Sequence, residues 1–216
     1  MKYELVVFDW DGTLLDSTGA IVRAIQAACA DLDLPVPSRA QASHVIGLGL
    51  GDAMRHAVPD LKPENYQAMI DRYRFHYLSG DHELSLFAGV PQMLARLQAA
   101  GHVLAVATGK SRLGLERALD HSGLRPYFSA SRCADECHSK PHPQMLEELL
   151  AEFGVTEAAA VMIGDTSHDL LMARNAGVDA VAVTYGAHPV EHLQAHAPRV
   201  CAQDVAELDG WLRVHG

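Results

Sequence analysis

Two carboxylates lie directly after the first apolar run of the sequence. Asp9 and Asp11 are two positions apart in the segment FDWDGT, where Gly12 allows the chain to turn sharply. Carboxylates this close repel each other unless a cation lies between them, and carboxylate oxygens are the ligands that hard divalent cations prefer. An Asp-x-Asp-Gly segment is also a common strand-to-turn junction, so these residues alone leave both interpretations open.

Other polar groups of complementary chemistry follow later in the chain. Thr108 and Gly109 offer a hydroxyl group and an unobstructed backbone amide just before a helical pattern, which suits a phosphate group. Lys140 comes shortly before a helix that begins at a proline, and Asp165 and Asp169 are one helical turn apart. If these groups converge with the first acidic pair, they form a site for a hard cation and a phosphoryl group.

The elements that must position these groups are predicted from apolar runs. Five runs are continuously apolar, as expected for strands covered by helices on both faces: 3–8, 102–108, 127–131, 160–164 and 179–184. Helical patterns separate the later runs: 90–100, 113–122, 143–153 and 169–176. This alternation predicts an α/β fold with a doubly wound, Rossmann-like, mainly parallel sheet. Ligands of such sheets bind beyond the carboxyl ends of the strands, where the polar groups lie.

One long interval lacks any convincing strand. Between about residues 16 and 86 the sequence shows helical segments at 21–32 and 64–78, separated by turn-rich pieces. An all-helical insert of this length after the first strand predicts a separate α-helical cap domain at 16–86. The core domain would then consist of residues 1–15 and 87–216.

Four motifs in this order resemble the haloacid dehalogenase-like hydrolases, and within them the phosphoglycolate phosphatase-like group with a helical cap after strand one. The resemblance spans residues 5 to about 185. It rests on Asp9-Trp10-Asp11-Gly12-Thr13, Thr108-Gly109, Lys140 and Gly164-Asp165 with Asp169.

The resemblance implies a catalytic role for each matching residue. Asp9 would attack phosphorus and form an aspartyl phosphate, and Asp11 would protonate the leaving group and then activate water. Thr108 and the amide of Gly109 would bind phosphoryl oxygens, and Lys140 would neutralise charge and orient Asp9.

The resemblance also implies a magnesium cofactor. Mg²⁺ would be held by the Asp9 carboxylate, the main-chain carbonyl of Asp11 and Asp165, with Asp169 supporting Asp165 or Lys140 from behind. The substrate would be a small-molecule phosphate monoester of the phosphoglycolate or sugar phosphate type. Since a halide leaving group needs no proton, the presence of Asp11 favours phosphate chemistry over dehalogenation.

Two other functions stay open at this point. A β-phosphoglucomutase-like phosphomutase also needs the second carboxylate, and it would transfer the phosphate group to a sugar rather than to water. A catalytically idle binding protein on the same scaffold is the other alternative, although it would have no need to retain Asp9, Asp11, Thr108, Lys140 and Asp165.

Composition limits the partners. The chain has 27 acidic and 17 basic residues, a net charge of −10, so its surface does not favour nucleic acid or anionic lipid. No run approaches the roughly 20 apolar residues of a membrane helix. The four cysteines form no disulfide framework, and the expected location is the cytoplasm. The sequence indicates no oligomeric state.

Several tempting patterns fit known motifs poorly. Gly109-Lys110-Ser111 resembles the end of a P-loop, but Leu104 stands where the first glycine is required, and Lys110 is expected to be exposed. The segment 47–51, GLGLG, follows no strand and is either a flexible turn or a loop lining the substrate entrance.

Three patterns of possible ligand residues are expected to be structural or solvated. These are Cys133, Cys137, His138 and His142 as a zinc site; His188, His192 and His196 on one helical face; and Arg23 as a contact for a distal substrate anion.

Overall fold

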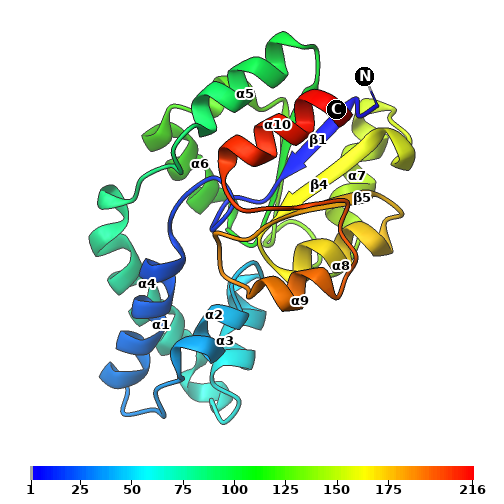
Figure 1. The fold of residues 1–216 in the computed structure, drawn as a ribbon. Coiled ribbons are helices and arrows are strands. Elements are labelled where there is room, and N and C mark those ends of the chain that lie inside the picture. Colours follow the sequence, from blue (N-terminus) through cyan, green and yellow to red (C-terminus); the bar gives the residue numbers. More distant parts are fainter. Residues whose placement is uncertain (1) are drawn as a thin grey trace.

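The computed structural model describes residues 2–216, including every side chain among them except that of His82. Its centre is a six-stranded sheet in the order β3-β2-β1-β4-β5-β6, and every neighbouring pair of strands is parallel (Figure 1). The strands are β1 (Leu5–Phe8), β2 (Val103–Thr108), β3 (Ala130–Cys133), β4 (Ala160–Gly164), β5 (Asp179–Val183) and β6 (Cys201–Ala202). The predicted α/β class with a doubly wound parallel sheet is confirmed.

Helices cover both faces of the sheet because successive side chains of each strand point to opposite faces. Val6 and Phe8 of β1 join one apolar cluster, and Leu5 and Val7 join another. The first cluster includes side chains of α5 (Val90–Ala99), α6 (Arg112–Ser122) and α10 (Val205–His215). The second includes α7 (Gln144–Phe153) and α8 (Ser167–Asn175), and α9 (Val190–Gln194) packs on α8 and β6. No helix among residues 2–216 has the length and apolarity needed to cross a membrane.

A separate group of helices lies beyond one edge of the sheet (Figure 1). It contains α1 (Thr18–Asp31), α2 (Arg39–His44), α3 (Leu50–Ala57) and α4 (Tyr66–Gly80), which we call the helical group. These helices bury an apolar cluster of their own that includes Ile25, Met54 and Met69. Two connecting segments join this group to the sheet and run side by side. The Asp16 N–H donates to the Ser85 carbonyl at 2.9 Å, and the Phe87 N–H donates to the Leu14 carbonyl at 3.0 Å.

The predicted bounds of the third strand were wrong, and two elements near the margins of the sheet were missed. The third strand, expected at 127–131, is Ala130–Cys133, because Arg125–Tyr127 forms a 3₁₀ turn around Pro126. The two-residue strand β6 and helix α10 were not predicted. These elements lie at or near the outer strands, where apolar runs are shorter and the sequence signal is weaker.

Candidate active site

The carboxyl ends of neighbouring strands bring the predicted site residues to one edge of the sheet. Asp9 directly follows β1, Thr108 is the last residue of β2 and Asp165 directly follows β4, and β1 pairs with both other strands. Lys140 reaches this edge from the segment before α7. All four side chains are no more than 2% exposed.

Lys140 joins two of the carboxylates. Its Nζ lies 2.9 Å from Asp9 Oδ1 and 2.6 Å from Asp169 Oδ1. Burial acts to lower the pKa of Lys140, but the negative charges of Asp169 and Asp9 outweigh it and hold the pKa above its usual value. The other oxygen of Asp169 accepts hydrogen bonds from the N–H and hydroxyl group of Thr166, which caps α8. Asp169 therefore holds the ammonium group of Lys140 next to Asp9.

Asp165 is a buried carboxylate that forms no ion pair with any described residue. It accepts hydrogen bonds from Thr13 Oγ1 at 2.9 Å and from the Ala187 N–H at 2.7 Å. Burial raises its pKa well above the usual value, and the charges of Asp9 and Asp169 add to that effect. The carboxylate lies so close to Gly12 that a Cβ there would be 2.1 Å from Oδ2, and Gly12 also has a positive φ of 78°.

The three aspartates fit a divalent cation. One oxygen each from Asp9, Asp165 and Asp169 lie within 4.8 Å of one another. Apart from the ion pair with Lys140, both carboxylate oxygens of Asp9 are buried without a hydrogen-bond donor in the described part of the chain. Burial raises the pKa of Asp9 to about 7 even with Lys140 beside it. Such orphaned acceptors are expected where a hard cation supplies the missing positive charge.

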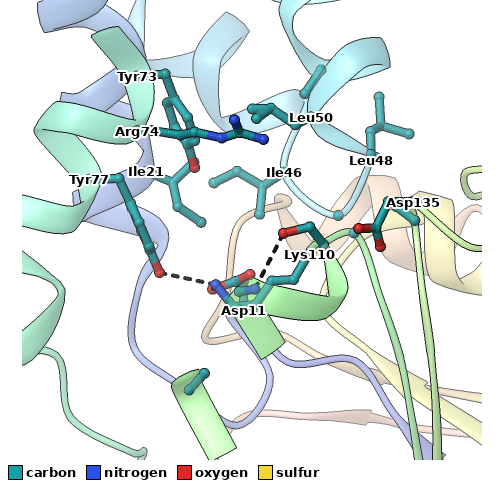
Figure 2. Close-up of a pocket in the computed structure, with 18 of the residues that line it drawn as sticks. Asp11, Ile21, Ile46, Leu48, Leu50, Tyr73, Arg74, Tyr77, Lys110 and Asp135 are labelled. Carbon is teal, nitrogen blue, oxygen red and sulfur yellow. Dashed lines mark hydrogen bonds and ion pairs between the residues drawn. The ribbon is translucent and has the colours of Figure 1, made fainter. Parts of the chain in front are cut away.

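Asp11 lies at the mouth of this site and has its own partners. Lys110 Nζ is 3.0 Å from Asp11 Oδ1, and Ser17 Oγ donates to the same oxygen at 2.6 Å. Lys110 also donates to the hydroxyl group of Tyr77 in α4 at 3.1 Å, as Figure 2 shows. The expectation of an exposed Lys110 was wrong: its side chain is 11% exposed, because the ion pair and Tyr77 compensate for its burial.

The segment 47–51 of the helical group lies against the phosphate-binding motif predicted at Thr108 and Gly109. A Cβ on Gly109 would lie 2.5 Å from the Leu48 carbonyl oxygen and 2.7 Å from that of Gly47. The Gly49 N–H donates to Ser139 Oγ at 2.8 Å. All five residues of the segment line a cleft of about 1440 Å³ that reaches Asp11, so the segment is part of the cleft wall rather than a detached turn.

Two further patterns from the sequence, Arg23 and the histidine stripe, lie away from the catalytic edge of the sheet or differ from expectation. Arg23 is exposed on α1 and is not among the residues that line the cleft. The predicted solvated histidine stripe was wrong at His188, which is 3% exposed and precedes α9. Its ring stacks on that of His44 with centroids 5.0 Å apart.

Four residues around the site were not assigned a contact role from the sequence: Thr13, Ser17, Tyr77 and Lys110. Thr13 and Lys110 each lie within two residues of a predicted site residue, so extending each motif along the chain would have found them. Ser17 and Tyr77 have no local signal, because their contacts depend on how the connecting segment and α4 fold back on the sheet.

Comparison with known proteins shows the family to which this sequence and fold are similar. Residues 6–183 match the family model described as haloacid dehalogenase-like hydrolase. The chain is 38% identical to "Probable phosphatase IndB" of Dickeya dadantii, over 95% of this chain and 92% of that protein. It is 31% identical to a "5'-nucleotidase" of Pseudomonas aeruginosa, over 100% and 98% of the two chains. A solved structure described as a predicted phosphoglycolate phosphatase from Haemophilus somnus superposes with a TM-score of 0.87, at 26% identity over 100% and 99% of the chains.

Proposed function

The chain belongs to the haloacid dehalogenase-like hydrolases, and from this premise we propose that it is a magnesium-dependent phosphatase acting through an aspartyl phosphate on Asp9. Its class as a hydrolase of this family rests on the match over residues 6–183. The observation that carries the mechanism is the Asp9 carboxylate. Apart from the ion pair of Lys140 with one of them, its two oxygens are buried without a donor among residues 2–216 as the structure describes them. A nucleophile needs free lone pairs directed at its target.

The first step is attack by an Asp9 carboxylate oxygen on the phosphorus atom of the ester. The new oxygen–phosphorus bond forms as the bond from phosphorus to the leaving-group oxygen breaks. Lys140 reduces the repulsion between the carboxylate and the phosphate dianion, and Asp169 keeps Lys140 in position. Thr108 Oγ1 and the Gly109 N–H are proposed to hold the phosphoryl oxygens, since both lie at the carboxyl end of β2.

Asp11 is proposed as the acid and base. Asp11 must enter the first step protonated, and it gives this proton to the departing alkoxide. The resulting carboxylate then takes a proton from a water molecule, whose oxygen attacks phosphorus and breaks the bond to Asp9, releasing phosphate. Its place on the cleft lining supports this role, because the leaving group must lie on that side of the phosphorus. Ser17 and Lys110 hold the carboxylate in one orientation.

The proposed ligands of Mg²⁺ are Asp9, Asp165 and the main-chain carbonyl of Asp11, with Asp169 fixing Lys140 from behind. The charges support a cation there. When ionised, the four carboxylates Asp9, Asp11, Asp165 and Asp169 outnumber the two nearby ammonium groups, those of Lys110 and Lys140, by two negative charges before any phosphate enters. When bound, the ion would neutralise phosphoryl oxygens and lower the barrier to attack by an anion.

We further propose that residues 16–86 act as a cap. The helical group has its own apolar cluster, which favours movement as a rigid unit. The two adjacent segments that join it to the sheet would be the hinge. Its segment 47–51 covers Gly109, which would exclude water from the site while the phosphoenzyme forms. Four free cysteines support a reducing, cytoplasmic location.

The proposed substrate is a small-molecule phosphate monoester, and the resemblance in sequence favours the phosphoglycolate or sugar phosphate type. A second candidate is a nucleoside 5′-monophosphate, because a relative aligned over nearly its whole length is named a 5'-nucleotidase. The size of the cleft, about 1440 Å³, also leaves room for a nucleoside.

The test is phosphate release from an activated aryl phosphate, measured with Mg²⁺ and with EDTA for the wild type and for Asp9→Asn. Metal-dependent release that disappears in Asp9→Asn is the expected result. Release that continues in Asp9→Asn would overturn the aspartyl phosphate. In a parallel assay with a hexose phosphate as substrate, isomerised hexose phosphate without free phosphate would replace hydrolysis by the phosphomutase reaction.

A further inference from the structure

The cleft between the helical group and the sheet has an apolar wall across from Asp11, the one proposed catalytic carboxylate that lines it. Ile21, Ile46, Leu48 and Leu50 line it on the side of the helical group, and the ring of Tyr73 lies beside them (Figure 2). A leaving group extending from Asp11 towards these side chains meets few hydrogen-bonding partners there. Such a wall suits a ring-sized apolar body better than a two-carbon acid or a sugar with many hydroxyl groups.

The cations on the cleft lining are not equivalent. The cleft is lined by four arginine or lysine residues: Arg55, Arg74, Lys110 and Arg117. Arg55 pairs with Asp52, Lys110 with Asp11 and Arg117 with Asp81. Arg74 forms no ion pair or hydrogen bond with any described residue. Its charge is therefore available to a ligand without first breaking an internal pair.

The position of Arg74 would allow it to contact the far end of a ligand bound at Asp11. It belongs to α4, next to Tyr73 and one turn before Tyr77, and Figure 2 shows its guanidinium group extending across the cleft between Leu50 and Ile46. Asp11 lies at the opposite end of the same group of side chains in that view. A ligand bound at Asp11 would have to pass the apolar side chains before it met Arg74.

We propose that the substrate is a phosphate monoester whose leaving group has a ring-sized apolar body and ends in a carboxylate or a similar acceptor, which Arg74 binds. This inference rests on the proposed phosphatase function, and it replaces the phosphoglycolate and sugar phosphate types favoured by the resemblance with a different substrate class. The planar guanidinium group offers two parallel N–H donors, the arrangement that a carboxylate accepts best. Arg74 is thus a specificity-determining residue, and it takes the role that the sequence suggested for Arg23.

The test compares two aryl phosphates of equal size and similar leaving-group reactivity, 4-(2-carboxyethyl)phenyl phosphate and 4-isopentylphenyl phosphate, with 2-phosphoglycolate as the small substrate. The wild type is expected to prefer the carboxylate ester by about 10-fold in kcat/KM, since a charged hydrogen bond contributes that order of selectivity. Arg74→Gln is expected to abolish this preference by lowering kcat/KM for the carboxylate ester. Arg74 and Arg23 are both exposed, but only Arg74 lines the cleft. Arg23→Gln therefore removes the same charge at a matched position outside the cleft and should retain the preference.

Two results would overturn the proposal. Equal kcat/KM for the two aryl esters in the wild type would show that Arg74 does not bind the distal carboxylate. A higher kcat/KM for 2-phosphoglycolate than for either aryl ester would rule out the apolar leaving group.

Calorimetric binding of both aryl esters to the inert variant Asp9→Asn separates this proposal from the phosphatase proposal. Binding that depends on Arg74 without hydrolysis by the wild type would overturn the phosphatase and retain the ligand class. Hydrolysis and binding that are both insensitive to Arg74 would overturn the ligand class and retain the phosphatase.

Discussion

At the residue scale, the site is defined by which charges have partners and which do not. Lys140 is shared by Asp9 and Asp169, and Lys110 is paired with Asp11. The side chain of Asp165 has only neutral hydrogen-bond donors in the described part of the chain. A buried carboxylate without a cationic partner is costly, so Asp165 is the position where an external cation would gain most. The same reasoning separates Asp9, a carboxylate with free lone pairs, from Asp169, whose oxygens are both occupied.

Replacement of the proposed acid and base gives a kinetic prediction. Asp11→Asn can still lose a leaving group that needs no proton, but it can no longer activate water to hydrolyse the aspartyl phosphate. We expect a burst of about one equivalent of p-nitrophenol from p-nitrophenyl phosphate, followed by turnover roughly 10²–10⁴-fold slower than wild type. An alkyl phosphate should give no burst.

Stopped-flow absorbance measures the burst, and Asp9→Asn, which has no nucleophile, is the control without one. Full steady-state activity of Asp11→Asn on the alkyl ester would refute the role assigned to Asp11.

The residues of the site differ in how far the sequence can predict them. Asp9, Thr108, Lys140 and Asp165 could be predicted because each follows a strand end or precedes a helix, and the parallel sheet places such positions at one edge. The partners of Lys110 could not be predicted in this way. Its burial depends on Tyr77, which comes from a separate helix and reaches Lys110 only through the packing of the helical group.

At the element scale, the contact between the helical group and β2 depends on a residue without a side chain. Gly109→Ala would place a Cβ 2.5 Å from the Leu48 carbonyl oxygen, and a backbone atom cannot yield without moving the segment 47–51. We expect this variant to fold but to lose kcat/KM by on the order of 100-fold, the cost of displacing a closing element by about 1 Å.

Steady-state kinetics and thermal melts measure the two parts of this prediction. Gly210→Ala in α10, where a Cβ meets no atom within 4 Å, is the matched control and should retain full activity. An active Gly109→Ala enzyme would mean that the segment need not approach β2 for turnover.

A second contact between elements is sensitive to pH. His188 Nδ1 accepts from the Ser167 N–H at 3.0 Å, and its Nε2–H donates to the His44 carbonyl at 3.1 Å, so the neutral ring fits both partners. Burial lowers the pKa of His188 to about 4, and the nearby His168 adds to the effect. A pKa below the unfolded value of about 6.5 means that stability is complete above pH 6.5 and is lost as the pH falls towards 4.

We therefore expect the wild type to lose roughly 2 kcal/mol of unfolding free energy between pH 8 and pH 5 from this group alone. His188→Gln should be less stable at pH 8, yet it should lose less stability on acidification. Urea denaturation at pH 8, 6.5 and 5 measures both slopes, with His192→Gln, an exposed histidine on α9, as the control. Identical slopes in wild type and His188→Gln would show that His188 does not titrate in this range.

The sequence predicts the central strands of the fold better than its margins, for a physical reason. β1, β2 and β4 are buried on both faces, so each appears in the sequence as a nearly continuous apolar run. β3 lies at one edge, and its residues Ala-Ser-Arg-Cys are mostly half-buried, so the aromatic residues of the preceding turn gave a stronger strand signal. The two residues of β6 are too few for any periodicity.

At the scale of the whole molecule, the site stores a destabilising excess of negative charge between the sheet and the helical group. Asp9, Asp165 and Asp169 are all buried, and the pKa values of Asp9 and Asp165 are raised, which means that burial disfavours their ionised forms. Binding of Mg²⁺ should therefore stabilise the entire fold, since a ligand that binds only the folded state shifts the unfolding equilibrium.

At a concentration 100 times its dissociation constant, Mg²⁺ should add about 2.7 kcal/mol to the free energy of unfolding. For a chain of this size, this corresponds to a rise in Tm of roughly 5–10 °C. Asp165→Asn removes one buried charge while keeping a side chain of similar shape, so without metal it should melt above the wild type and no longer respond to Mg²⁺. Asp60→Asn removes the same charge from an exposed position of the helical group and should respond as the wild type does. Calorimetric melts with Mg²⁺ and with EDTA distinguish these outcomes, and an undiminished Mg²⁺ response in Asp165→Asn would exclude Asp165 as a ligand.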